Sequence, residues 1–119
     1  MHALIIDSAE VVATRLHDLL DEMNCFQNIS FADNYNEAVA QIDDNTPDVV
    51  LLDIQLPDNS GIELLKLIKQ KHPCLKVIVL TNKSSETYRN ICEQIGSDHF
   101  IDKSTSFENI TSIIRSYLT

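Results

Sequence analysis

The chain of 119 residues is poor in several residue types: it has no tryptophan, two glycines and three prolines. Collagen-like, low-complexity and disordered chains are excluded, because they need more glycine, proline or charge and contain far fewer hydrophobic residues than the 44% found here. The three cysteines, Cys25, Cys74 and Cys92, lie far apart and form no CxxC pattern. Neither a disulfide scaffold nor a zinc site therefore follows from the sequence.

Long apolar runs and targeting signals are also lacking. No run approaches the ~18 apolar residues that a membrane span requires, and the first residues lack the basic segment and cleavage pattern of a signal peptide. The length suits one compact domain and is too short for two. We therefore expect a single domain over residues 1–119, without membrane contact, in the reducing cytoplasm.

Basic residues are scarce, with 9 Lys and Arg against 18 Asp and Glu and a formal net charge of −9. Such a charge argues against direct nucleic-acid binding and against an anionic membrane surface. The imbalance lies in the first 60 residues, which hold 12 acids and one base, Arg15, whereas the rest holds 6 acids and 8 bases. We expect part of this asymmetry to reflect a site whose acids and cation come from opposite halves of the chain.

Short apolar runs alternate along the chain with segments of helical periodicity. Continuous apolar runs rich in β-branched residues at 3–6, 49–52 and 77–80 indicate strands covered on both faces, and weaker runs at 28–32 and 99–101 indicate strands nearer the sheet edges. Apolar residues spaced by three and four predict helices within the segments 12–23, 35–42, 64–68, 88–95 and 110–118. The pattern predicts an α/β fold of five βα units, a doubly wound parallel sheet of flavodoxin-like order 2-1-3-4-5.

Polar residues fit the ends of these helices. Asp33 or Asn34 can cap the second helix, Ser84 or Ser85 the fourth, and Ser104–Ser106 the fifth. Gly96 follows the fourth helix as a stop signal.

The carboxyl ends of the predicted strands carry the chemistry. They read Asp7-Ser8, Asp53, Thr81-Asn82 and Lys103-Ser104, and in the predicted order these groups meet at one edge of the sheet. Two neighbouring carboxylates repel each other, and a divalent cation and a lysine relieve that repulsion. Both also suit a phosphoryl group. Asp53 is therefore a candidate nucleophile with Lys103 as its counter-ion.

Four segments together carry a resemblance to a known family. They are Leu-Ile-Ile-Asp at 4–7, Asp-Val-Val-Leu-Leu-Asp-Ile-Gln-Leu-Pro-Asp-Asn-Ser-Gly at 48–61, Val-Ile-Val-Leu-Thr at 77–81 and Phe-Ile-Asp-Lys at 100–103. Over essentially its whole length the chain resembles the receiver domain of two-component response regulators. Phosphoryl transfer of that kind depends on positioning and charge neutralisation more than on covalent activation.

The resemblance implies a role for each matching residue. Asp53 is the expected phosphoacceptor, taking the group from a histidine kinase or a histidine phosphotransfer protein. Mg²⁺, or Mn²⁺, is expected on Asp7, Asp53 and the backbone carbonyl of Gln55. The remaining implied roles are phosphoryl-oxygen contacts from Thr81 and Lys103, and switching by Thr81 together with Phe100.

Three positions depart from the family pattern. Ser8 stands where a second acid is usual. It can act as a weak or water-mediated ligand, as the N-cap of the first helix, or as both, and we expect weak metal binding. Ser104 replaces a proline that is usually cis; because a cis non-proline bond costs about 2.5–4 kcal/mol, we expect a trans Lys103–Ser104 bond, with a strained cis bond as the alternative. Asn82 is larger than the usual residue, so it either narrows access to the site or is an ordinary residue of the loop surface.

The leading hypothesis is a Mg²⁺-dependent phosphoacceptor that catalyses only its own phosphorylation and dephosphorylation. Phosphorylation would remodel the face of the fourth helix, fifth strand and fifth helix, which would contact an output domain or target protein, with a homodimer possible on activation. The alternative is a pseudo-receiver that binds proteins independently of phosphorylation. An aspartyl phosphatase is disfavoured because Gln55 replaces the acid it needs, and a flavin carrier because the first loop carries negative charge.

Overall fold

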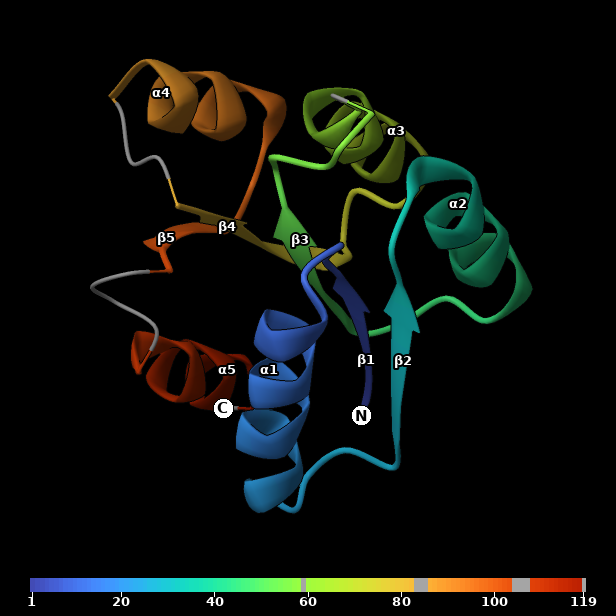
Figure 1. Cartoon of the computed structure of the whole chain (residues 1–119), viewed down its shortest axis with the longest axis vertical. Helices are drawn as coiled ribbons and strands as arrows, with labels where there is room; N and C mark the ends of the chain where they lie inside the picture. Colours follow the sequence, from blue (N-terminus) through green and yellow to red (C-terminus); the bar gives the residue numbers. More distant parts are fainter. Residues whose placement is uncertain (59, 83–85, 104–107, 119) are drawn as a thin grey trace.

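The computed structural model describes residues 1–58, 60–82, 86–103 and 108–118. Its five strands are β1 (His2–Ile6), β2 (Asn28–Ala32), β3 (Val49–Asp53), β4 (Lys76–Thr81) and β5 (His99–Asp102). Its five helices are α1 (Glu10–Glu22), α2 (Tyr35–Asp44), α3 (Gly61–Lys71), α4 (Glu86–Ile95) and α5 (Asn109–Leu118). All strand pairs are parallel, in the order β2-β1-β3-β4-β5 (Figure 1), which confirms the predicted fold class.

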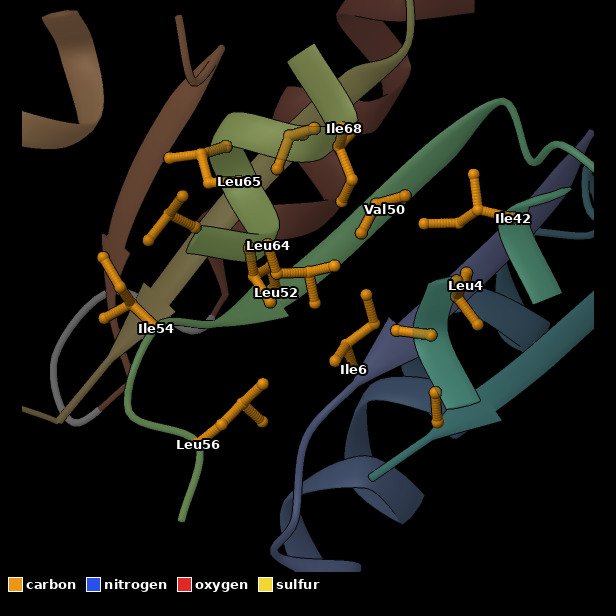
Figure 2. Packing of buried hydrophobic residues seen from close by; sticks show 14 of the residues in the cluster. Leu4, Ile6, Ile42, Val50, Leu52, Ile54, Leu56, Leu64, Leu65 and Ile68 are labelled. Carbon is orange, nitrogen blue, oxygen red and sulfur yellow. The ribbon is translucent and has the colours of Figure 1, made fainter. Parts of the chain in front are cut away.

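The interiors of the three central strands are apolar because helices cover both faces of the sheet. Successive side chains of a strand point to opposite faces, so Leu51 packs on one face and Leu52 on the other. The helices α1 and α5 cover the face of Leu51, and α2, α3 and α4 cover the face of Leu52 (Figure 1). Figure 2 shows the second of these cores, where side chains of β1 and β3 meet those of α3.

The two weaker runs form the edge strands, as predicted from their mixed composition. In β2 only Ala32 is buried, and the ring of Phe31 is 42% exposed and stacks on His17 of α1. In β5 the middle residues Phe100 and Ile101 are buried while the end residues are half-buried. None of the helices in the described ranges is long and apolar enough to cross a membrane.

Of the helix-end signals that fall on described residues, those at Asn34 and Gly96 are confirmed and the one at Ser8 is not. Asn34 caps α2 by accepting a hydrogen bond from the Glu37 amide at 2.9 Å. Gly96 ends α4 with a φ of +116°, a conformation that favours glycine, and its amide donates to the Cys92 carbonyl at 3.0 Å. The predicted caps at Ser84 or Ser85 and at Ser104–Ser106, and the Lys103–Ser104 bond, lie outside the described residues.

Ser8 is not the N-cap of α1, so that alternative was wrong. The cap residue is Ala9, and its amide donates to Asp7 Oδ1 at 2.8 Å. An aspartate carboxylate readily accepts from the backbone two residues later, and this turn places Ser8 outside the helix with an exposed side chain.

The loop from β3 to α3 returns so tightly that its two ends touch. A Cβ atom built on Gly61 would lie 2.1 Å from the carbonyl oxygen of Ile54, a distance that no side chain tolerates. Within the loop, the Asp58 carboxylate accepts hydrogen bonds from the hydroxyl and the amide of Ser60, and the hydroxyl bond lowers the pKa of this exposed acid. Glycine at position 61 therefore fixes the loop that follows Asp53.

We predict that Gly61→Ala destabilises the protein by about 1–3 kcal/mol, because the methyl group displaces the backbone at Ile54. Urea unfolding followed by circular dichroism measures the change. Lys66→Ala, an exposed substitution in the same helix, is the control and should stay within about 0.5 kcal/mol of the parent. Equal stability of Gly61→Ala and the parent would show that the loop opens without cost.

Candidate functional site

Four polar side chains lie buried at the carboxyl edge of the sheet. Asp7 follows β1, Asp53 ends β3, Thr81 ends β4 and Lys103 follows β5. They are the buried polar and charged residues identified in the described part of the chain, and each is at most 8% exposed. The fold therefore collects at one place the four strand-end groups that the sequence singled out.

Lys103 joins the two buried acids. Its Nζ lies 2.6 Å from Asp7 Oδ2 and 3.1 Å from Asp53 Oδ2, although Asp7 and Lys103 are 96 positions apart in the chain. One ammonium faces two carboxylates, so the formal charge of the cluster is −1 when all three groups are ionised. A cluster with this excess of negative charge has an electrostatic reason to attract a further cation.

The other carboxylate oxygens accept backbone amides. Asp7 Oδ1 accepts from Ala9 and Asp53 Oδ1 accepts from Gln55, both at 2.8 Å. Each carboxylate is thus held at both oxygens, one by a loop amide and one by Lys103. Because an ionised carboxylate has about four acceptor positions, both side chains keep capacity for a further partner.

Backbone hydrogen bonds extend the sheet into the site. The amide of Asp7 donates to Ala32 at 3.1 Å, and that of Lys103 donates to Thr81 at 2.8 Å. The amide of Ile54, directly after the nucleophile candidate, donates to Leu80 at 3.1 Å. The four side chains of the site are therefore positioned by the hydrogen bonds of the sheet, at the ends of β1, β3, β4 and β5.

The side chain of Gln55 has a role that the sequence analysis missed. Only its backbone carbonyl was assigned, yet its Oε1 accepts from the Thr81 hydroxyl and from the Asn82 amide, each at 3.2 Å. The sequence shows a polar residue two places after Asp53 and gives no indication of its partner. This bond connects the loop after β3 with the loop after β4.

Ser8 lies next to Asp7 and is exposed, and both residues line the same groove. The groove has a volume of about 430 Å³ and lies between α1, β2 and α2, and its acidic lining residues include Glu10 and Glu37. Among the described residues, no three His, Cys, Asp or Glu side chains form a group that could hold a metal ion. A cation at Asp7 and Asp53 would therefore take its other ligands from backbone carbonyls and water.

Phe100 lies beneath α4 and not in the cluster of charges. Its ring is 9% exposed, and the Arg89 guanidinium sits over it at 4.9 Å from the ring centroid. The helix above it is loosely buried: Cys92 is its one buried residue, and Tyr88 and Ile91 are exposed. Burial raises the pKa of the Cys92 thiol to about 11, so this residue is neutral at physiological pH.

The fold and the site together define a class: a doubly wound α/β protein with two acids and one lysine paired at the carboxyl edge of its sheet. The family model for the response regulator receiver domain matches residues 3–115. The chain therefore belongs to the response regulator receiver domain family, signalling domains of two-component systems in which phosphorylation and Mg²⁺ are typical.

Individual relatives agree with this family. The chain is 33% identical over 115 residues to the transcriptional regulatory protein CpxR of Klebsiella pneumoniae, covering 97% of this chain and 48% of that protein. A two-component response regulator from Clostridium difficile superposes with a TM-score of 0.90 at 25% identity, covering 99% of this chain and 95% of that one. A signal receiver domain from Colwellia psychrerythraea has a TM-score of 0.91 at 22% identity, covering 99% and 98%. The chain spans about half the length of several curated relatives that it matches.

The bridge at Lys103 yields a stability prediction. Lys103→Met leaves two buried carboxylates without their cation, and we expect a loss of about 3 kcal/mol in the free energy of unfolding at neutral pH. Adding Asp53→Asn should recover part of that loss, because one of the two charges is then removed. Lys76→Met is the control: its ion pair with Asp98 is half exposed, and the expected loss stays below about 1 kcal/mol. Equal losses for Lys103→Met and Lys76→Met in urea unfolding would contradict the bridging role.

Proposed function

We propose that residues 1–119 act as one receiver domain in which Asp53 accepts a phosphoryl group from a histidine kinase or a histidine phosphotransfer protein. The observation that supports it best is the setting of Asp53: a buried carboxylate held at one oxygen by the Gln55 amide and at the other by Lys103, beside Asp7. Membership of the family supports the same role.

In the proposed step, a carboxylate oxygen of Asp53 attacks the phosphorus of the donor phosphohistidine. A P–O bond forms, the P–N bond breaks, and the imidazole nitrogen of the donor leaves with the electron pair. Such transfers need charge neutralisation and alignment more than covalent activation. Lys103 is the cation already at Asp53, and the Thr81 hydroxyl on the neighbouring strand is the proposed donor to a phosphoryl oxygen.

The donor set of the site fits a hard divalent cation. Asp7 and Asp53 offer carboxylate oxygens with acceptor capacity left, and Gln55 offers its backbone carbonyl. Mg²⁺ takes such oxygen ligands and keeps several waters. When bound, it would neutralise charge on the transferred group. Because exposed Ser8 supplies no charge, we propose that Mg²⁺, or Mn²⁺, binds weakly, with Ser8 as a weak or water-mediated ligand.

Phosphorylation would then act on the face formed by α4, β5 and α5. It adds about −1.5 to −2 charges and new acceptor oxygens at Asp53, toward which the Thr81 hydroxyl would turn. Phe100 would follow into the space that Thr81 leaves. The shallow burial of α4 supports this proposal, since that helix has one buried residue to hold it. The proposed partners of this face are an output domain, a target protein or a second copy, in the cytoplasm.

A pseudo-receiver is the second candidate function. The observation that favours it is Ser8, because only two acids remain for the metal in the described part of the chain. Such a domain would bind its partners through the same face without phosphorylation.

Phosphorylation with a small-molecule donor separates the two candidates. With acetyl phosphate and Mg²⁺, we expect the intact protein to gain the mass of one phosphoryl group, and Asp53→Asn to gain none. Asp58→Asn, which neutralises an exposed acid of the same loop, is the matched control and should be labelled like the parent. Absence of a mass gain in the parent, even at high Mg²⁺, would contradict the phosphoacceptor role and favour the pseudo-receiver.

Restoring an acid at position 8 tests the assignment of the metal ligands. Ser8→Asp changes the formal charge of the site from −1 to −2, and we expect Mg²⁺ affinity to rise by about tenfold or more. Ser8→Asn has a similar size and no charge, so its affinity should stay within about threefold of the parent. Isothermal titration calorimetry gives the three affinities. Equal values for Ser8→Asp and Ser8→Asn would show that position 8 does not reach the cation.

A further inference from the structure

One residue contacts both the candidate phosphoacceptor and the end of β4. The backbone amide of Gln55 donates to Asp53 Oδ1 at 2.8 Å, while its side-chain Oε1 accepts from the Thr81 hydroxyl and the Asn82 amide, each at 3.2 Å. The backbone of Gln55 thus holds the candidate phosphoacceptor, and its side chain holds the end of β4. We propose that this side chain is a latch that keeps the Thr81 hydroxyl in a resting position, which makes Gln55 a positioning residue; the inference rests on the proposed function.

The latch follows from the single proton that the Thr81 hydroxyl can donate. A threonine hydroxyl carries a single proton, so it donates to one strong acceptor at a time. In the structure Gln55 Oε1 accepts from this hydroxyl at 3.2 Å. The hydroxyl must leave Gln55 before it can donate to a phosphoryl oxygen on Asp53. The two states of Thr81 therefore exclude each other, and Gln55 favours the resting one.

The surroundings of the latch allow it to open. Thr81 is fully buried, so its hydroxyl exchanges one protein acceptor for another and not for bulk water. Gln55 is half-buried and Asn82 is exposed, so water can replace the bond between them. A charged phosphoryl oxygen is a stronger acceptor than an amide carbonyl, which gives the hydroxyl its reason to move. Phosphorylation would thus release Gln55 from Thr81, and the loop after β4 would lose one of these two hydrogen bonds to the loop after β3.

A ligand that binds only the released state must overcome the latch. Removing the acceptor of the latch therefore raises the apparent affinity of such a ligand by the factor by which the latch favours the resting state. Hydrogen bonds between neutral groups correspond to a factor of about three to ten in such an equilibrium. Beryllofluoride, which imitates a phosphoryl group on an aspartate, is a suitable ligand because it forms no covalent product.

The experiment compares the parent with Gln55→Met and Gln55→Glu at saturating Mg²⁺. Methionine keeps the length and the backbone carbonyl but has no strong acceptor, whereas glutamate keeps an acceptor oxygen. For Gln55→Met we expect about threefold to tenfold tighter beryllofluoride binding, and faster hydrogen exchange at the Asn82 amide without ligand. Exchange at the Ile54 and Lys103 amides, which bond to the sheet, should not change. In Gln55→Glu the Asn82 amide should exchange as slowly as in the parent.

The outcomes separate the latch from the proposed function. Parent protein that neither binds beryllofluoride nor accepts phosphate would overturn the proposed function and, with it, the positioning role. Parent protein that binds, together with unchanged Asn82 exchange or unchanged affinity in Gln55→Met, would overturn the latch alone. Faster exchange at Ile54 and Lys103 as well would also overturn it, because the substitution would then have loosened the whole edge of the sheet.

Discussion

The site depends on the pairing of Lys103 with two buried carboxylates. The register of the sheet places Ile6 opposite Leu52, so the acids that follow these strands come close together whatever their charge. Burial strengthens their repulsion, and the ammonium from the end of β5 offsets it at 2.6 and 3.1 Å. Because Lys103 lies 96 positions from Asp7, this balance exists only when the whole sheet has formed. The site therefore forms only when the strands that carry these three residues have paired in the sheet.

The interiors of the central strands make that pairing possible because they are apolar. Along β3, every residue before Asp53 is an aliphatic side chain with no exposed surface. The polar groups of the site therefore have no competing partners beneath them, and their orientation is set by the ladder bonds at Ile54 and Lys103. The close approach of Gly61 to Ile54 closes the loop over the same edge. Part of the charge asymmetry of the chain is explained by this site, because the acidic first half supplies both carboxylates and the second half supplies the lysine.

The sequence predicts the sheet and the meeting of its polar ends because these depend on simple periodicities. A continuous run such as Val49–Leu52 is readable as a buried strand, and parallel strands bring their ends to one edge. Two details depend on local geometry that no periodicity encodes. Ser8 matches the residue type of a helix cap, but the Asp7 carboxylate takes the Ala9 amide first. The side chain of Gln55 reaches Thr81 only because two loops from different strands lie side by side, a contact across 26 positions.

The shallow attachment of α4 also bears on where the molecule opens. The other four helices each contribute at least two buried residues, whereas α4 contributes Cys92, with Ile95 packed at its last position. Both anchors lie in the second half of the helix, next to the turn that Gly96 closes. Undocking its first half would expose little apolar surface, which is typical of segments that open locally at low free energy. We therefore expect the first half of α4, which begins five positions after Thr81, to separate from the sheet more readily than its second half.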